Sequence, residues 1–294
     1  MEYVLNELSL CGQYADREQF ATSGMKPLLG VIKTLSSFGV NDILKKRSFY
    51  DSEVTGTLKL YELTKSRMSP EVLAFCSQLS RMQGEPFWDV KSSQAEGIRY
   101  FLQRPGKGEA TVEEDVTASG VAEAYARKGC LISFRDDGYE GTSENVRRED
   151  EVDYPETGVT NLHDKEETEQ FLFESGQIDY QGYIKSRYCV KLMYDELSAN
   201  HGLNLVNSAN FRQFFASFKD FEEYSWQQII TSDGFDYKEF KNNKNTRSYF
   251  STELWAKGIH KFRVSQEIRC FGYREGDKFH LLRIDLDHVL SDKG

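Results

Sequence analysis

The chain has few of the residues that usually mark a metal site or a disulfide framework. It has five cysteines in 294 residues, at Cys11, Cys76, Cys130, Cys189 and Cys270. No C-x-x-C pair is present, which excludes the commonest cysteine zinc sites. An odd, scattered set of thiols is typical of proteins in a reducing compartment. We therefore expect most of these side chains to be small buried apolar groups, and the protein to be cytoplasmic.

Long apolar segments and the common phosphate-binding loops are also missing. No apolar run approaches 18 residues, so we expect no membrane span. The first residues, MEYVLNELSL, lack the basic start and apolar middle of a signal peptide. No G-x-x-x-x-G-K-[ST], G-x-G-x-x-G or G-x-S-x-G motif occurs. These absences exclude a P-loop, a dinucleotide fingerprint and the nucleophile elbow of α/β-hydrolases.

The chain also lacks an excess of basic residues, since its net charge at pH 7 is −10. This balance argues against a general nucleic-acid coat protein. The charge is unevenly placed: residues 136–179 contain fifteen acidic and three basic side chains, whereas residues 241–294 contain eleven basic and seven acidic ones. We expect 136–179 to be a solvated acidic loop or insertion, or a surface helix with no core face. Such an acidic surface could also shield the basic end. The basic end is a candidate for phosphate contacts, with solvated strand edges as the simpler interpretation.

Helical and strand patterns alternate along the first part of the chain and predict an α+β protein. A short strand is expected at the start of the chain. Apolar residues at helical spacing predict a helix over 16–39 that ends at Gly39. A capping-box pattern that begins at Thr111 predicts a second helix over 111–129, and a buried strand follows over 130–134.

The composition changes near residue 180, which divides the chain into two predicted domains. Residues 1–180 form a mixed α/β region of no recognised family, and residues 181–294 form a domain of helices on a small antiparallel sheet. A phenylalanine stripe at helical spacing predicts a core helix: Phe211, Phe214, Phe215, Phe218 and Phe221. Three strands with short turns close the chain: 259–264, 267–274 and 278–288.

These last strands carry ionisable residues that fit cleavage of RNA without a metal or another cofactor. Alternation puts Lys261 and Arg263 on one face of the first strand. Arg269 begins the second strand, His288 ends the third, and Glu253 lies in a helical turn just before them. RNA cleavage needs a base for the 2′-hydroxyl, an acid for the leaving oxygen and a fixed cation for the phosphate. Glutamate and histidine can supply the first two, and the planar fork of arginine fits a phosphate.

The segment HKFRVSQEIRCFGYREGDKFHLLRIDLDH resembles the closing three strands of the RelE/YoeB-type toxins of bacterial toxin–antitoxin systems. Those are small proteins with helices on a twisted antiparallel sheet, and many cut messenger RNA, often on the ribosome, without a metal. The resemblance extends over about residues 205–294. It implies that Glu253 is the base, Arg269 the phosphate stabiliser and His288 the acid. The residues that it implies for RNA binding are Lys261, Arg263 and Arg274.

Two acidic residues depart from the family pattern. Asp285 and Asp287 lie beside His288, where the family sheet is less acidic. Carboxylates in that position would favour the charged form of the imidazole, which could help a general acid. They would also repel the phosphates of RNA.

The sequence therefore predicts a metal-independent endoribonuclease, a toxin-like effector in bacterial phage defence. Its expected partners are RNA, including messenger RNA on the ribosome, and an antitoxin-like protein regulator. The N-terminal region would supply autoinhibition, assembly or trigger sensing. One alternative is a non-catalytic subunit that uses a degenerate RelE-like sheet to bind a protein partner. A nuclease acting on DNA, and a metal-dependent nuclease built on Asp236 and Glu239, are further alternatives.

Overall fold

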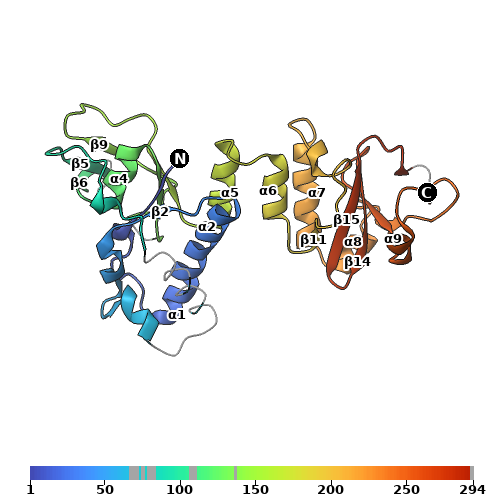
Figure 1. Ribbon diagram of the computed structural model, residues 1–294, viewed down its shortest axis with the longest axis horizontal. Helices are drawn as coiled ribbons and strands as arrows, with labels where there is room; N and C mark the ends of the chain where they lie inside the picture. Colours follow the sequence, from blue (N-terminus) through green and yellow to red (C-terminus); the bar gives the residue numbers. More distant parts are fainter. Residues whose placement is uncertain (66–72, 74–76, 78–83, 106–110, 136–137, 292–294) are drawn as a thin grey trace. The chain divides into compact units, whose positions relative to one another are not determined.

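The computed structural model describes residues 1–65, 73, 77, 84–105, 111–135 and 138–291, which contain both helices and sheets, as expected of an α+β protein (Figure 1). They divide into two compact units, Met1–Thr168 and Glu169–Gly294. The division falls within helix α5 (Lys165–Glu174), whereas the sequence placed it at residue 180. Within the described residues, none of the helices combines the length and hydrophobicity of a membrane-spanning segment.

The N-terminal unit is built on a five-stranded sheet. Its strands, in order across the sheet, are β2 (Ile43–Leu44), β1 (Tyr3–Leu5), β7 (Cys130–Ile132), β10 (Val159–Leu162) and β8 (Ser143–Glu144). The first four are parallel, and β8 runs antiparallel to β10. Val4 and Leu131 share one core cluster with helix α4 (Gly120–Arg127), as alternation along neighbouring strands requires.

The helix expected between the first two strands is present. It begins as α1 (Arg17–Gln19), continues through the π-helical segment η2 (Phe20–Met25) and ends as α2 (Lys26–Ser37). Gly39 follows it with φ +86°, a conformation that glycine adopts without steric cost. The prediction for residues 16–39 is therefore confirmed.

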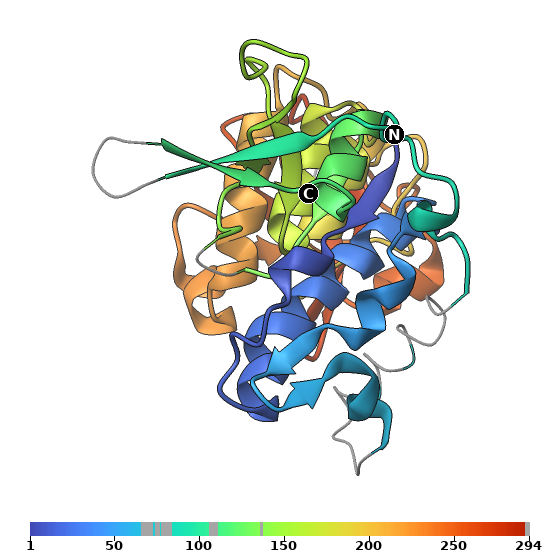
Figure 2. The same ribbon diagram turned by 90° about the vertical axis from the view of Figure 1, so that its left-hand side faces the viewer.

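The helix expected over 111–129 is wrong in its first part. Strand β6 (Thr111–Asp115) pairs with β5 (Tyr100–Pro105), and Figure 2 shows the two as a long hairpin. Arg104 and Glu114 form an ion pair across this hairpin, at 2.9 Å. Helix α4 starts later, where the side chain of Ser119 accepts a hydrogen bond from a backbone N–H of the first turn. Pairing with the preceding strand in a hairpin has overridden the local capping pattern.

The acidic segment 136–179 is also not the predicted loop or insertion. Its described part contains β8, β9 (Val146–Arg148), β10 and α5, and β9 pairs with β5. Glu144 is buried and accepts a hydrogen bond from Asn161 Nδ2 at 2.9 Å. Glu151 accepts a hydrogen bond from the hydroxyl of Tyr125. A few of the acidic side chains are therefore used inside the fold, while most of the described ones are exposed, as the composition indicated.

The C-terminal unit contains the three predicted strands in a five-stranded sheet. Its strands, in order across the sheet, are β11 (Leu192–Met193), β15 (Lys278–Asp285), β14 (Arg269–Glu275), β13 (His260–Arg263) and β12 (Lys238–Glu239). β11 is parallel to β15 and the other pairs are antiparallel. The predicted turn at Gly276 has φ +59° and joins β14 to β15.

Helices cover both faces of this sheet (Figure 1). On one face, α6 (Tyr180–Arg187), α7 (Phe211–Glu223) and α8 (Trp226–Thr231) enclose the larger core cluster. Phe214, Phe218 and Phe221 are fully buried there, so the aromatic stripe is confirmed as core. On the other face, a smaller cluster around Phe271 packs against α9 (Thr252–Ala256).

A bulge in β15 changes which side chains reach each face. Phe271 pairs with Arg283 and Gly272 pairs with Leu281, so Leu282 is an extra residue in β15. Because of it, Arg283 lies over the ring of Tyr249, in the smaller cluster, instead of following Leu281 into the larger one. A Cβ atom on Gly272 would lie 2.1 Å from the carbonyl oxygen of His280. The bulged pairing therefore requires glycine at 272.

We expect Gly272→Ala to destabilise the C-terminal unit by roughly 1–3 kcal/mol, because the added methyl group must push two paired strands apart. Chemical denaturation followed by tryptophan fluorescence measures the change. Gly56→Ala is the control, since a Cβ atom there meets nothing within 4 Å. The control should shift stability by less than about 0.5 kcal/mol. Equal effects of the two substitutions would show that the close approach at Gly272 is not required.

Candidate functional site

Arg269, the expected phosphate stabiliser, is a buried residue at the start of β14. It is 4% exposed, and its Nη1 donates to the carbonyl oxygens of Ser265, Gln266 and Ile268 at 2.6, 3.2 and 3.0 Å. The guanidinium therefore holds the turn between β13 and β14. These hydrogen bonds give Arg269 a structural role in the sheet.

Lys261, expected to hold the RNA backbone, is also inside the protein. It is 5% exposed, and its Nζ donates to the carbonyl oxygen and the Oγ of Ser291 at 2.7 and 3.0 Å. The same ammonium lies 5.5 Å from the ring centroid of Phe240. This lysine anchors the segment that follows β15, a position unlike the exposed contact that the resemblance implies.

The other two residues expected to bind RNA are more exposed, and they contact different elements. Arg263 Nη2 lies 3.4 Å from Asp236 Oδ2. Arg274 donates from Nε to the carbonyl oxygen of Gly276 at 2.8 Å, and its guanidinium lies 4.1 Å from the ring of Trp226. Trp226 belongs to the larger core cluster, so Arg274 lies on the α8 side of the sheet.

Glu253 and His288, the expected base and acid, lie on α9 and beyond β15. Glu253 is exposed, and a hydrogen bond with the side chain of Ser251 holds the pKa of its carboxyl below the ordinary value. A lowered pKa makes a carboxylate a weaker base. His288 is half-buried, with φ +63°. The register pairs Arg269 with Asp285, so the predicted hairpin does place the start of β14 beside the end of β15.

A cavity of about 310 Å³ lies at this end of β15 and is the strongest candidate site in the unit. The polar side chains that line it are His201, Tyr249, Arg283, Asp285 and Asp287. The guanidinium carbon of Arg283 lies 5.3 Å from the ring centroid of Tyr249. Its Nε is shielded from solvent and has no hydrogen-bond partner among the described residues. Arg283 lines the cavity, whereas the guanidinium of Arg269 is used by the turn between β13 and β14.

Asp285 holds a proton more tightly than an ordinary aspartate. Its Oδ2 accepts hydrogen bonds from the backbone N–H groups of Leu290 and Ser291, at 3.0 and 3.1 Å. Burial raises the pKa of the carboxyl, and a hydrogen bond with Asp287 and the negative charge of that residue raise it further. The two backbone bonds oppose this shift without cancelling it. A raised pKa makes the carboxyl of Asp285 a better candidate for a general acid than an ordinary aspartate.

None of Glu253, Arg269 and His288 lines this cavity, whereas Arg283 and the two aspartates do. The aspartates stood out in the sequence as the departure from the family pattern. Strand alternation could not identify Arg283 as a site residue. Phe279 and Leu281 belong to the larger core cluster, so a regular strand would direct Arg283 toward that cluster as well. The bulge alone turns it to the cavity.

Two other candidate positions are satisfied within the fold. In parallel sheets ligands commonly bind beyond the carboxyl ends of the strands. Here Asn6 Nδ2, after β1, donates to Ser133 Oγ, after β7, at 2.9 Å. The carboxylate of Glu7 accepts the backbone N–H of Gly120 at 3.0 Å, and burial raises the pKa of this carboxyl despite that bond and the nearby Lys46. These polar groups are therefore hydrogen-bonded within the fold.

In the described part of the chain, Asp236 and Glu239 are not grouped with further ligands as the metal-dependent alternative requires. Asp236 is 3.0 Å from the ammonium of Lys238 as well as facing Arg263, and Glu239 is exposed on β12. Over the described part of the chain, no three histidine, cysteine, aspartate or glutamate side chains are grouped to hold a metal ion.

We expect Asp285→Ala to destabilise the C-terminal unit by roughly 1–3 kcal/mol, because two buried N–H groups lose their acceptor. Asp285→Asn keeps an acceptor oxygen and should retain most of the stability. In the native protein the free energy of unfolding should also fall as pH rises above about 4, since the folded state binds its proton more tightly than the unfolded chain. The asparagine variant should lose that component. Denaturant titrations between pH 4 and 8 measure both effects, and equal stability of the two variants would contradict the acceptor role.

Comparison with known proteins supplies no relative for this chain. No protein-family model matches it, and neither the curated proteins nor the solved structures give a match. The chemistry of the cavity at the end of β15 is therefore the basis for a functional conclusion.

Proposed function

We propose that the C-terminal unit is an endoribonuclease that works without a metal, with its active site in the cavity at the end of β15. The observation that carries this proposal is that Arg283 and Asp285, whose pKa is raised by burial and by Asp287, line one cavity. These are two of the three groups that cleavage through the 2′-hydroxyl requires. The proposal keeps the expected reaction and moves its site along the same sheet.

The third group is an imidazole. His201 lines the cavity, and its carbonyl oxygen accepts the backbone N–H of Ile284 at 2.7 Å, which fixes this residue beside β15. In the proposed reaction His201 takes the proton of the 2′-hydroxyl as its oxygen attacks phosphorus. The bond to the 5′-oxygen breaks, and that oxygen takes the proton held by Asp285 and Asp287. The products are a 2′,3′-cyclic phosphate and a free 5′-hydroxyl.

Arg283 stabilises the phosphate in this scheme. Charge builds on the non-bridging oxygens as phosphorus becomes five-coordinate, and a preorganised guanidinium stabilises that charge. Tyr249 lies against Arg283 and holds its plane. Lys261 and Arg269 act indirectly, since their hydrogen bonds fix the segments on either side of the cavity.

We expect the purified protein to cleave RNA in the presence of EDTA and to leave 2′,3′-cyclic phosphate ends. Arg283→Ala should lower the rate by roughly 10²- to 10³-fold. Arg212→Ala, an exposed arginine on α7, should leave it unchanged. The assay uses labelled RNA and DNA, with and without ribosomes. Absence of cleavage under every condition would contradict the proposal.

A matched pair of histidine variants distinguishes this site from the one the resemblance implies. His201→Ala should lower cleavage by roughly 10²- to 10⁴-fold, because it removes the proposed base, and His288→Ala should have a much smaller effect. The opposite ranking would place the chemistry at the residues implied by the RelE/YoeB resemblance.

The pH dependence tests the acid. Since the aspartate pair must carry a proton, the rate should fall as pH rises through the raised pKa of Asp285. Asp287→Asn removes a neighbouring negative charge, so this fall should move to lower pH. A pH profile of single-turnover rates measures the shift, and an unchanged profile would exclude the pair as the acid.

The alternative function is a non-catalytic, partner-binding subunit. It is favoured by the internal use of Arg269 and Lys261, two residues that RNA would otherwise contact. An intact, folded protein that binds no RNA and cleaves none would support it. Toxicity on induced expression that Arg283→Ala relieves would support the nuclease instead.

A further inference from the structure

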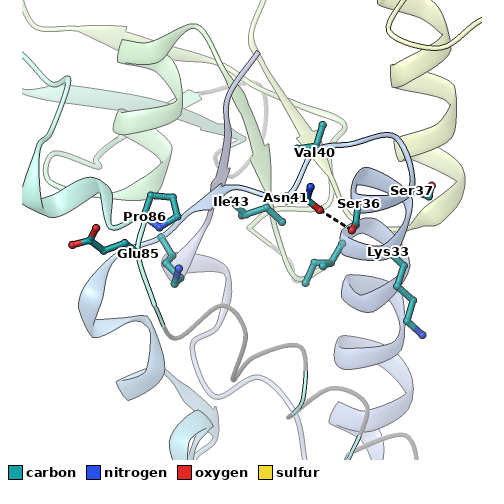
Figure 3. Close-up of a pocket in the computed structure, with 10 residues that line it drawn as sticks. Lys33, Ser36, Ser37, Val40, Asn41, Ile43, Glu85 and Pro86 are labelled. Carbon is teal, nitrogen blue, oxygen red and sulfur yellow. Dashed lines mark hydrogen bonds between the residues drawn. The ribbon is translucent and has the colours of Figure 1, made fainter.

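A second cavity lies at the edge of the N-terminal sheet, between the end of α2 and the segment that leads into Phe87. It encloses about 500 Å³, within the size range of small-molecule sites. Ile32, Val40, Ile43 and Pro86 give it an apolar lining. Figure 3 shows Ser36 and Asn41, which also line it, joined by a hydrogen bond of 3.0 Å.

The cavity contains a buried amine, that of Lys45, which forms no ion pair with the residues that the structure describes. Lys45 is 1% exposed, although it lines the cavity. Its Nζ donates to the carbonyl oxygen of Gly84 at 2.7 Å and lies 4.8 Å from the ring centroid of Phe87. Among the described residues no carboxylate lies within ion-pair distance of it. Burial lowers the pKa of Lys45, and the charge of Asp42 only partly offsets this.

An ammonium has three N–H donors, and a carbonyl oxygen together with a ring face satisfies two of them. A buried charge without an opposite charge costs free energy, which an anion in the same cavity would recover. The backbone of Lys45 does not explain why a charged residue occupies this position. Its carbonyl oxygen accepts a hydrogen bond from the backbone N–H of Trp88 at 3.0 Å, which any residue could do.

Among the carboxylates near the cavity, that of Asp42 acts on Lys45 through its charge and would weaken the binding of an anion. Figure 3 shows the carboxylate of Glu85 directed away from Ile43 and Asn41, and Glu85 is exposed. The last carbonyl groups of α2 are already occupied: that of Leu35 accepts the N–H groups of Phe38 and Val40, at 3.1 and 2.9 Å. The negative end of the helix is thereby weakened toward the cavity.

We propose that this cavity binds a small molecule with a carboxylate or phosphate group, which pairs with the ammonium of Lys45 while the rest of the molecule contacts the apolar lining. The N-terminal unit would then be a ligand-binding unit, in addition to the activity proposed for the C-terminal unit and independently of it. Carboxylates and phosphates share the oxyanion that a lysine recognises.

The test is a binding titration of the full chain with two probes, inorganic phosphate followed by ³¹P line broadening and butyrate followed by saturation-transfer NMR. We expect saturable binding of at least one probe, and the stronger one tells a phosphate from a carboxylate ligand. Lys45→Met should weaken binding by roughly tenfold or more, the loss of one charge-assisted hydrogen bond. Lys26→Met is the control, because Lys26 is an exposed lysine at the start of α2 outside the cavity lining, and it should bind as the native chain does.

Two outcomes would overturn the proposal: no saturable binding of either probe, or equal affinity in Lys45→Met and the native chain. If Lys45→Met does not fold, the native chain decides the question. Trace acetylation mapped by mass spectrometry should then be slowed at Lys45 by the bound probe and unchanged at Lys26, an exposed lysine at the start of α2. Absence of that protection would also overturn it.

Discussion

The candidate site in the C-terminal unit depends on one extra residue in β15. Without Leu282 as a bulge, strand alternation would send Arg283 toward the larger aromatic cluster, where a guanidinium would be buried among phenylalanines. With the bulge, Arg283 lies over Tyr249 and lines a cavity with Asp285 and Asp287. The pairing is possible because Gly272 has no Cβ atom to meet the carbonyl of His280. The bulge, which requires glycine at position 272, thus decides that Arg283 lines the cavity.

Buried cations recur in both units, and their roles differ according to what they contact. The Nη1 of Arg269 has three carbonyl acceptors, and Lys261 has both oxygen atoms of Ser291, so both groups are used by the chain itself. Lys45 has one carbonyl and one ring face, beside an open volume. A buried cation whose hydrogen-bond donors are used by the fold has a structural role, whereas one with a donor left over beside a cavity is a candidate to bind a ligand. This distinction separates the residues that hold the sheet from those that can bind.

Carboxylates show the same contrast. Glu144 accepts a hydrogen bond from a buried asparagine, and Glu7 accepts the N–H of Gly120 at the start of α4, so both belong to the internal frame of the N-terminal unit. Asp285 also accepts backbone bonds, but its neighbour is a second carboxyl group, and burial and that neighbour together favour a retained proton. A carboxyl with a raised pKa beside an arginine in a cavity can donate a proton to a ligand, whereas a carboxylate that only accepts hydrogen bonds within the fold has a structural role.

The sequence by itself determined the regular elements whose signals are local. The helical spacing of Phe214, Phe218 and Phe221 predicted a core helix, and Gly276 predicted the last hairpin, because period and turn chemistry depend on neighbours along the chain. Tertiary structure decided the rest. Thr111 joined a strand because β6 pairs with the preceding strand β5, and in the segment 136–179 β9 pairs with β5 and β10 pairs with β7. The same holds for the site: Arg269 and Lys261 had the residue types of a phosphate site, but burial assigned them to the frame, and the bulge brought Arg283 to the cavity. Burial and register are set by contacts between residues distant in sequence, which no local pattern contains.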